Sequence, residues 1–460
     1  MTKISLEELT SLAKRRGFVF QGSEIYGGLA GTWDYGPLGV LLKNNLRELW
    51  WRHFVSERDD VYGLDTAILM NPKVWEASGH TGAGFADALV EDKVTHKRYR
   101  ADHLLEDSGV ASAAELTLDQ LEAKIKDLKL KSPDGNALSS VRQFNLMFET
   151  RIGPVEDTAS TAYLRPETAQ GMFVNFKNVL DSMHPRLPFG LAQVGKNFRN
   201  EITPRDFLFR VREFEIMELE YFIKPGDWEG QFESLRQSAY DWFERIGLEK
   251  ATIHELEVPE ADRAHYSRRT IDFEYEFSGF GTKEIGALAY RTDFDLANHA
   301  KHSGQDLSYT DPESGEKFIP HVLEPTFGLD RHFLAVLSAG YEVEDVEGEQ
   351  RVVLKLKPEL APVKLAVSPL LRNKPELVAV AQAAYKELKK DFGAVMYDDN
   401  GNIGKRYRRQ DEIGTPLCVT IDFDSLEDQS VTVRHRDTMK QDRVKIAELT
   451  ERVKSQLAEF

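Results

Sequence analysis

One stretch, residues 198–222, limits what this chain can fold into more than any other. Its sequence is FRNEITPRDFLFRVREFEIMELEYF. Aromatic and β-branched residues, which favour strands, dominate both ends, whereas Thr-Pro-Arg-Asp in the middle favours a loop. We therefore predict that one strand ends over residues 198–201 and that a second strand runs from 209 to 222.

The second strand should have two unlike faces, because alternate side chains of a strand point to opposite sides of its sheet. The odd positions are mostly apolar, although Glu213 and Glu215 are among them, and the even positions are mostly charged. On the even face Arg210, Phe214 and Glu218 follow one another at spacings of about 13 Å. A cation, an aromatic ring and a carboxylate in this order suit a ligand with phosphates, a flat base and an amine.

A solvent-exposed strand whose charged side chains form ion pairs is an alternative explanation, because it would show the same alternation. Arg199 and Glu201, however, share one face of the preceding strand, so two adjacent strands would present matched polar faces. This pairing favours a binding surface. The pattern F-R-x-E, a loop, and then R-x-x-x-F-x-x-x-E resembles motif 2 of the class II aminoacyl-tRNA synthetases.

Three further segments extend the resemblance to nearly the full chain. Residues 23–39, SEIYGG followed by GTWDYGPLG, resemble the N-terminal signature of the glycyl-tRNA synthetases, in which the proline and the following helix form motif 1 and the dimer interface. RPETAQG at 165–171 is similar to another segment of that family. Residues 328–335, G-x-D-R-x-x-x-A, resemble motif 3 of class II synthetases.

The resemblance implies an α+β fold in which an antiparallel sheet flanked by helices binds the substrates. A proline-punctuated linker at 357–362 separates two compositions, so we predict a catalytic domain over 1–357, with an insertion over 101–160, and an α/β anticodon-binding domain over 358–460. Neither GxGxxG nor GxxxxGK[ST] occurs, so side chains must hold ATP.

Local signals predict several helix starts. Ser5 with Glu8 and Thr117 with Gln120 have the form of capping boxes, and Pro37 and Pro166 stand where a first helical turn tolerates proline. Glu167 would lie in the first turn after Pro166. A strand ending near Glu324 and a turn at Gly328 should lead into a helix with Arg331 in its first turn. The helix dipole disfavours a cation at the start of a helix. A residue at a position that local preferences disfavour often has a functional role, so Arg331 is a candidate site residue.

Composition limits the cellular compartment in which we expect the protein. No apolar run approaches the roughly 20 residues that span a bilayer, and the N-terminus has no apolar signal-peptide core. A single cysteine, Cys418, excludes an internal disulfide framework and a multi-cysteine zinc cluster, so we expect a cytoplasmic protein without zinc.

The net charge is −17, but residues 361–460 carry 17 Lys and Arg against 16 Asp and Glu, so the acidic excess precedes them. Affinity for RNA must then come from a local basic cluster such as KRYRRQ at 405–410.

The resemblance implies a homodimeric, ATP-dependent, AMP-forming ligase that joins glycine to tRNA(Gly). Glycine would attack the α-phosphorus of ATP to give glycyl-adenylate and pyrophosphate, and a terminal ribose hydroxyl of tRNA would then take the glycyl group. Two alternatives are a catalytically inactive synthetase-like accessory or RNA-binding protein and a class IIa synthetase for another amino acid. The intact ATP ligands argue against the first, and SEIYGG and RPETAQG argue against the second.

The same resemblance implies roles for individual residues. Arg199 would hold the α-phosphate, Glu201 the adenine amino group and Phe214 the adenine ring, and Arg210 and Arg331 would hold the distal phosphates; Arg199 and Arg331 are the catalytic pair. The remaining ATP-site candidates are Asn200, Phe209, Glu284 (the expected Mg²⁺ ligand), Ile285, Gly328, Leu329 and Asp330. The glycine-site candidates are Arg100, Glu167, Phe214, Glu215, Glu218, Glu324, Thr326 and Gly328. The tRNA-binding candidates are Lys405, Arg406, Arg408 and Arg409.

Overall fold

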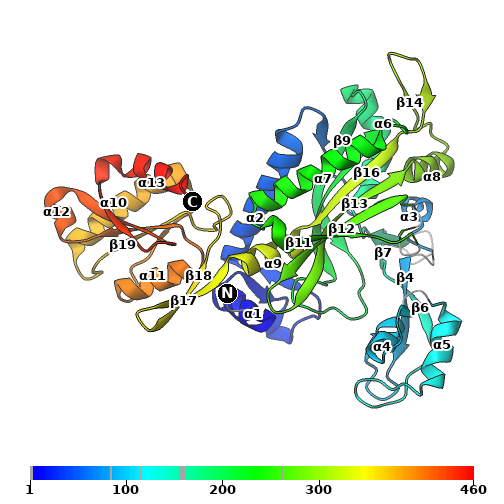
Figure 1. Cartoon of the computed structure of the whole chain (residues 1–460), viewed down its shortest axis with the longest axis horizontal. Coiled ribbons are helices and arrows are strands. Elements are labelled where there is room, and N and C mark those ends of the chain that lie inside the picture. Colours follow the sequence, from blue (N-terminus) through cyan, green and yellow to red (C-terminus); the bar gives the residue numbers. More distant parts are fainter. Residues whose placement is uncertain (1–3, 83–84, 114–115, 155–160, 261–262, 265) are drawn as a thin grey trace.

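A seven-stranded sheet forms the body of the protein (Figure 1), as seen in a computed structural model that describes residues 4–82, 85–113, 116–154, 161–260, 263–264 and 266–460. Its strands lie in the order β11-β12-β13-β16-β10-β9-β3, and every pairing is antiparallel except that of β3 with β9. The bounds are Ile253–Glu257 (β11), Arg269–Phe277 (β12), Gly281–Thr292 (β13), His321–Gly328 (β16), Glu213–Ile223 (β10), Phe189–Phe198 (β9) and Val61–Gly63 (β3). The predicted antiparallel sheet flanked by helices is confirmed.

Three helices cover one face of this sheet and bury the main hydrophobic core. They are α2 (Pro37–Trp51), α7 (Trp228–Arg245) and α9 (Leu329–Gly340). The odd-numbered side chains of β10, such as Met217 and Leu219, point into this core. Helix α2 begins at Pro37, as predicted, because proline has no N–H to lose at a first helical position.

The opposite face of the sheet is covered at one end only. Helices α6 (Ala169–Met183) and α8 (Phe294–Ser303) pack there around a second core that includes Phe173, Phe222 and Leu296. The other even-numbered residues of β10 are Phe214, Ile216, Glu218 and Glu220, so this face is mostly charged or aromatic, as the alternation in the sequence predicted. The part of the face that carries them contains the candidate site.

The predicted strand 209–222 begins later, at Glu213, and the strand before it ends at Phe198, three residues earlier than predicted. Residues 199–212 form a loop that contacts the glycine-rich N-terminal segment. The backbone N–H of Arg212 donates to the carbonyl oxygen of Gly31 at 2.8 Å, and its Nη1 donates to that of Ala30 at 2.7 Å. The backbone N–H of Arg199 still donates to the carbonyl oxygen of Arg212 at 3.0 Å, and beyond this bond the distant segment around Gly31 is the partner of Arg212.

Two helix predictions also need correction at their boundaries. Pro166 and Glu167 precede α6, which begins at Ala169 with Thr168 as its N-cap. Strand β16 continues through Glu324 to Gly328, and α9 follows directly. Both capping boxes are confirmed, at the starts of α1 (Leu6–Arg15) and α5 (Leu118–Asp127).

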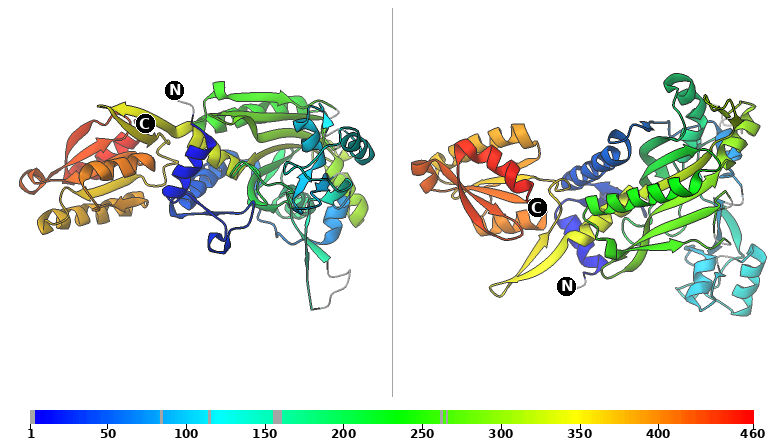
Figure 2. Two further views of the ribbon diagram at one scale, coloured as in Figure 1. Left: turned by 90° about the horizontal axis from the view of Figure 1, so that it is seen from below. Right: turned by 45° about the horizontal axis from the view of Figure 1, so that its top comes forward.

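The insertion is a small unit with its own core, and it projects from the body on the side away from the C-terminal part (Figure 2). It consists of β4 (Ala86–Glu91), β5 (Arg98–Arg100), α4 (Ala101–Asp107), α5 and β6 (Arg142–Asn145). The unit therefore begins at β4 rather than at residue 101, because β4 pairs with both β5 and β6. The last residues of the predicted insertion, 155–160, lie outside the described residues.

The C-terminal part has a five-stranded sheet in the order β20-β19-β21-β22-β23 and a separate core that begins at Leu365. Its elements are β19 (Leu365–Pro369), α10 (Pro375–Phe392), β20 (Val395–Tyr397), α11 (Ile403–Glu412), β21 (Leu417–Ile421), α12 (Asp424–Asp428), β22 (Ser430–His435), β23 (Gln441–Lys445) and α13 (Leu449–Leu457). This is the predicted α/β module.

A hairpin of β17 (Tyr341–Val346) and β18 (Glu349–Leu354) lies between the two parts (Figure 1). Arg351 of β18 is fully buried, and its Nε donates to the carboxylate of Asp411 on α11 at 2.8 Å. Asp411 also accepts from Arg434 at 2.9 Å. At the end of α11, Glu412 pairs with Arg15 and Arg16 at the end of α1. Helix α11 is thus joined by ion pairs to elements outside its own module.

The remaining short elements are β1 (Val19–Gln21), β2 (Trp33–Tyr35), α3 (Pro72–Ala77), β7 (Phe148–Arg151), β8 (Thr161–Leu164), β14 (Tyr309–Thr310) and β15 (Lys317–Phe318). Within the ranges that the structure describes, no helix is long and apolar enough to cross a membrane.

Candidate active site

A cavity of about 280 Å³ opens on the polar face of the large sheet, beside the loop 199–212. Strands β10, β13 and β16, that loop and the start of α9 all contribute to its wall. The sequence-predicted ATP ligands meet here although they are far apart in the chain. Those that line the cavity are Arg199, Glu201, Phe209, Arg210, Phe214, Glu284, Gly328, Asp330 and Arg331.

Arg199 lies at the inner end of this cavity. Its guanidinium carbon is 5.5 Å from the ring centre of Phe214 and 5.6 Å from that of Phe85, and its Nε donates to the carbonyl oxygen of Pro166 at 3.3 Å. These contacts fix the plane of the guanidinium but leave most of its N–H groups free to donate to a ligand. A planar fork of this kind suits phosphate oxygens.

Arg331 lies in the first turn of α9, as predicted, and Glu284 compensates for its unfavourable place at the positive end of the helix. Nη1 of Arg331 is 3.0 Å from the Glu284 carboxylate, and the guanidinium covers the ring of Phe209 at 4.4 Å. Gly328 has φ −73°, so no left-handed turn requires glycine there. A Cβ on Gly328 would lie 3.3 Å from Cδ of Arg331, and the glycine therefore leaves room for this side chain.

Two more carboxylates lie beside Glu284. Glu274 of β12 is its register partner on the neighbouring strand. Asp272 is close enough that burial, together with Glu284 and Glu274, raises the pKa of its carboxyl to about 7. Hard oxygen donors of this kind fit a Mg²⁺ ion, which takes one or two carboxylates and completes its shell with phosphate oxygens and water.

A second hollow, of about 410 Å³, is lined by Glu167, His80, Tyr266 and, again, Arg199. Arg199 is thus shared by both hollows. Two ligands bound side by side, one in each hollow, would meet at its guanidinium.

One buried carboxylate, that of Glu167, lines the second hollow. Glu167 is 3.2 Å from Nε2 of His80 and accepts from Nε2 of Gln170 at 2.9 Å. Although burial opposes ionisation of Glu167, the neighbouring His80 and Arg291 hold its pKa well below the usual range. This carboxylate therefore stays ionised and can receive a cation.

Glu218 and Glu324, on the paired strands β10 and β16, lie near Glu167 without lining the hollow itself. Glu218 accepts from the backbone N–H of Thr168 at 3.1 Å and from Oγ1 of Thr326 at 3.1 Å, and Glu324 accepts from Nη1 of Arg291 at 2.7 Å. Burial and the nearby Glu167 raise the pKa of Glu218. Burial also raises the pKa of Glu324, to about 8, although Arg291 opposes the shift.

Five predicted ligands point elsewhere or are already engaged. Glu215 borders the polar-face cavity, but its carboxylate pairs with Lys43 and Arg47 of α2. Arg100 pairs with Asp87 and Asp102 inside the insertion. Ile285 and Leu329 are buried in the main core. Asp330 accepts from Lys43 at 3.2 Å and from the backbone N–H of Glu215 at 2.7 Å, which makes it a support of the cavity floor.

The remaining predicted residue, Asn200, uses its backbone N–H to donate to the carbonyl oxygen of Leu146 at 2.8 Å, and this bond ties the loop to the segment that follows the insertion.

The basic cluster of the C-terminal part lies on α11, beside a hollow of about 840 Å³ lined by Lys405, Arg408 and Arg409. Arg406 does not share this surface. Its side chain is buried, and Nη2 donates to the carbonyl oxygens of Asp399 at 3.0 Å and Gly401 at 2.7 Å. The helical period explains the difference, because consecutive residues of a helix point in different directions.

Sequence reasoning missed several residues that shape the site. Arg291 is the buried cation at the centre of the carboxylates, and its spacing of four from Asp295 was the available signal. His80 and Thr168 carry no signal in a single sequence, since their roles depend on contacts with distant segments. Glu220 was noted only as one member of a charged strand face.

Comparison with known proteins gives two family matches. Residues 150–340 match the "tRNA synthetase class II core domain (G, H, P, S and T)", and residues 364–456 match an "Anticodon binding domain". Among solved structures, Giardia lamblia prolyl-tRNA synthetase in complex with prolyl-adenylate is similar in fold, with a TM-score of 0.67 at 15% identity over 99% of this chain and 80% of that one.

Curated relatives are more similar. A glycine–tRNA ligase of Caldanaerobacter subterraneus subsp. tengcongensis is 49% identical over 99% of both chains. The glycine–tRNA ligase of Bacillus anthracis is 50% identical over 97% of both, and that of Thermus thermophilus is 46% identical over 98% of both.

Proposed function

This chain belongs to the glycine–tRNA ligases, class II aminoacyl-tRNA synthetases that use ATP to join glycine to tRNA, and on that premise we propose how its residues divide the work. The observation that carries the proposal is that Arg199 lines both hollows. The polar-face cavity of about 280 Å³ would take ATP, and the hollow of about 410 Å³ that Glu167 lines (the acidic hollow) would take glycine. The α-phosphate, which glycine attacks, would then lie at Arg199.

ATP would be held entirely by side chains and by the sheet. Phe214 offers a ring on which adenine can stack, and Glu201 offers an acceptor for the adenine amino group. Arg210 and Arg331 lie on the same cavity wall and suit the distal phosphates. Displacement at phosphorus depends on position and on neutralised charge rather than on a protein nucleophile, so we assign no serine, cysteine or histidine to that role.

Glycine has no side chain that a pocket could contact. Its site must therefore recognise the charged ammonium group and exclude amino acids that carry a side chain. Glu167, Glu218 and Glu324 surround the place proposed for the ammonium group. A hydrophobic pocket gains only about 1 to 3 kcal/mol per methylene, which is too little for high specificity. We propose that the carboxylates around the ammonium group instead leave no room for a substituent on Cα, so that alanine is rejected by steric overlap and larger side chains are rejected more strongly.

We propose Glu284 as a ligand of Mg²⁺, with Asp272 and Glu274 as its acidic neighbours. The bound ion would neutralise charge on the phosphates of ATP. Glu284→Gln is expected to raise the Mg²⁺ concentration for half-maximal activity about tenfold, because an amide is a weaker ligand than a carboxylate. A Mg²⁺ titration of glycine-dependent ATP–pyrophosphate exchange measures this, with Glu276→Gln, an exposed glutamate near the end of β12, as the control. An unchanged titration would remove Glu284 from this role.

We propose that the α11 surface binds tRNA(Gly) through Lys405 and Arg408, with Arg409 held beside them by Asp398 at 2.8 Å. Lys405→Ala with Arg408→Ala should raise KM for tRNA several-fold and leave glycine-dependent ATP–pyrophosphate exchange unchanged. The loss should shrink as salt rises, because phosphate contacts are salt-dependent. Arg406→Ala should instead lower the melting temperature, since its buried bonds to backbone carbonyls are structural. A lower rate of ATP–pyrophosphate exchange in the variant with both Lys405→Ala and Arg408→Ala would contradict the proposal that these residues bind only tRNA.

We also propose a cytoplasmic homodimer without structural zinc. Val40 and Leu41 are apolar side chains exposed on α2, which begins at Pro37 in the segment that resembles motif 1. A second copy of the chain that packs on this helix would cover them.

Amino-acid-dependent ATP–pyrophosphate exchange tests the proposal as a whole. Glycine, alanine, serine, threonine and proline are compared in parallel, with Mg²⁺ and without tRNA. Exchange with glycine alone is expected. Exchange with another amino acid at a similar rate would contradict the pocket, and the absence of any exchange in folded protein would favour an inactive accessory or RNA-binding protein.

A further inference from the structure

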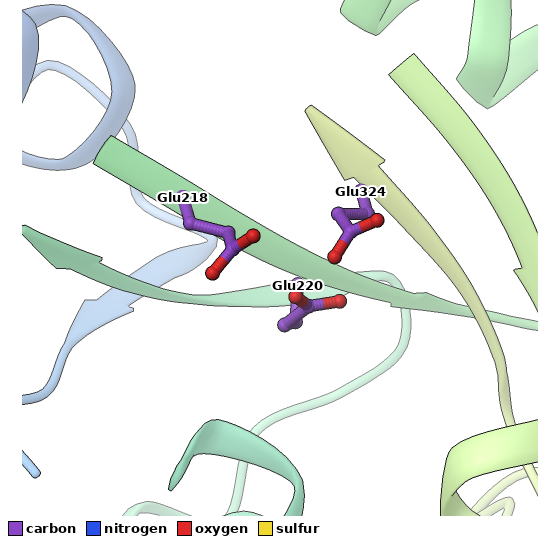
Figure 3. A group of neighbouring side chains, drawn as sticks. All are labelled: Glu218, Glu220 and Glu324. Carbon is purple, nitrogen blue, oxygen red and sulfur yellow. The ribbon is translucent and has the colours of Figure 1, made fainter. Parts of the chain in front are cut away.

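Glu220 is a buried carboxylate that the proposed reaction does not use. Its side chain has no exposed surface, and neither carboxylate oxygen has a hydrogen-bond partner among the described residues. It points toward Glu218 and Glu324 (Figure 3), and one oxygen of each of the three lies within 4.8 Å of the others. We call Glu218, Glu220 and Glu324 the carboxylate trio.

The sheet register forces this proximity. The pairing of β10 with β16 that joins Glu218 to Thr326 and Tyr221 to Leu323 places Glu220 directly opposite Glu324. Like charges directly opposite on paired strands are destabilising, and burial makes them more so. A fold that brings two glutamates together in this way must neutralise one of them.

The surrounding groups do not supply enough positive charge. Arg291 of β13 faces the trio, but Asp295 of α8 also engages it, with a separation of 2.8 Å between Arg291 Nε and the Asp295 carboxylate. On the other side, β9 places Leu191 as the register partner of Glu220. Glu167 lies near Glu218 and adds a further carboxylate, and its own basic partner is His80, whose Nε2 is 3.2 Å away. Arg291 is therefore shared among more carboxylates than it can balance.

We propose that the carboxylate trio holds a proton when the glycine site is empty, with Glu220 as its principal holder, and releases a proton to solvent when an ammonium group binds. One monovalent cation then replaces another, and the net charge of the pocket is unchanged. This inference rests on the proposed role of the acidic hollow as the glycine site. Glu220 acts in it as a positioning residue, because it is placed behind the carboxylates that would meet the substrate.

The titration behaviour of the trio agrees with its geometry. Burial first, and then Glu324, raise the pKa of Glu220 well above the ordinary range of a carboxyl. An incoming ammonium favours the ionised form and lowers these pKa values. Below the raised pKa values, free enzyme binds the extra proton, so glycine affinity should rise with pH, by up to about tenfold per pH unit for each proton released.

The experiment is a calorimetric titration of the whole enzyme at pH 7 with a sulfamoyl analogue of glycyl-adenylate, in phosphate and in Tris buffer. The difference between the two apparent enthalpies gives the number of protons released. The glycolyl analogue, in which a hydroxyl replaces the ammonium group, is the matched ligand. Both titrations contain EDTA, so that no divalent cation can occupy the trio.

We expect the glycyl analogue to release about one proton more than the glycolyl analogue. Glu220→Gln should reduce this release by at least half and flatten the pH dependence of glycine KM, with little effect on kcat. Glu213→Gln, an exposed glutamate on the same strand, should change neither.

The outcomes separate this inference from the proposed function. Tighter binding of the glycyl analogue without proton release would overturn the proton exchange alone. Equal binding of the two analogues would overturn the ammonium site itself. If Glu220→Gln does not fold, the wild-type release still decides the question, and release that persists unchanged in a folded Glu220→Gln would remove Glu220 from the role.

Discussion

Arg199→Ala is expected to reduce kcat of glycine-dependent ATP–pyrophosphate exchange about 10³-fold, while KM for ATP and for glycine changes much less. The reason is its place between the two hollows, where charge develops on the α-phosphate as glycine attacks. An interaction that strengthens in the transition state lowers the barrier without tightening ground-state binding. Steady-state exchange rates, with the concentration of each substrate varied in turn, give the separate effects of the substitution on kcat and on KM.

Two further variants make this prediction specific. Arg199→Lys keeps the charge but loses the planar fork, so it should recover part of the lost rate. Arg186→Ala removes an exposed arginine that pairs with Glu313 far from the site and should leave exchange unchanged. A loss below tenfold for Arg199→Ala, in protein with an unchanged melting temperature, would show that Arg199 does not contact the reacting phosphate.

Glu218→Gln should raise KM for glycine about 10²-fold and leave KM for ATP within about twofold, because it removes one charge from a buried ion pair with the ammonium group. The amide oxygen can still accept from the backbone N–H of Thr168 and from Thr326, so the fold should be preserved. Initial-rate exchange over a range of glycine concentrations gives the effect. Glu213→Gln on the same strand is the control.

Equal rises in the two KM values would mean that Glu218 supports the site as a whole and does not contact glycine. A large fall in melting temperature would have the same implication.

The sequence allowed the polar face of β10 and the helix at Pro37 to be predicted from local patterns, whereas the antiparallel sheet and the set of residues around the polar-face cavity were implied by the family resemblance. Period-two alternation placed Phe214 and Glu218 on one face, and it also placed Glu215 on the opposite face, with the core. The resemblance nevertheless suggested Glu215 as a glycine ligand. Physical alternation was the better guide, since Lys43 and Arg47 of α2 engage that carboxylate.

The errors have a common physical cause, which is contact between segments far apart in the chain. Residues 209–212 have strand-forming side chains, yet the bonds of Arg212 to the segment around Gly31 keep them out of the sheet. Arg406 belongs to a basic cluster, but carbonyl groups of the preceding turn hold it inside. Neither contact leaves a trace in local composition. The burial of Glu220 likewise depends on helices that cover the sheet from elsewhere.

The hairpin that carries Arg351 has a practical consequence for exchanging modules between relatives. A graft cut within the proline-punctuated linker would leave Asp411 without Arg351 and would separate Glu412 from Arg16. A transplant of the C-terminal module should therefore include residues 341–354 and match the end of α1. Chimaeras designed in this way would keep the charges around α11 balanced, whereas a cut at the linker would remove Arg351, one of the arginines that pair with the buried carboxylate of Asp411.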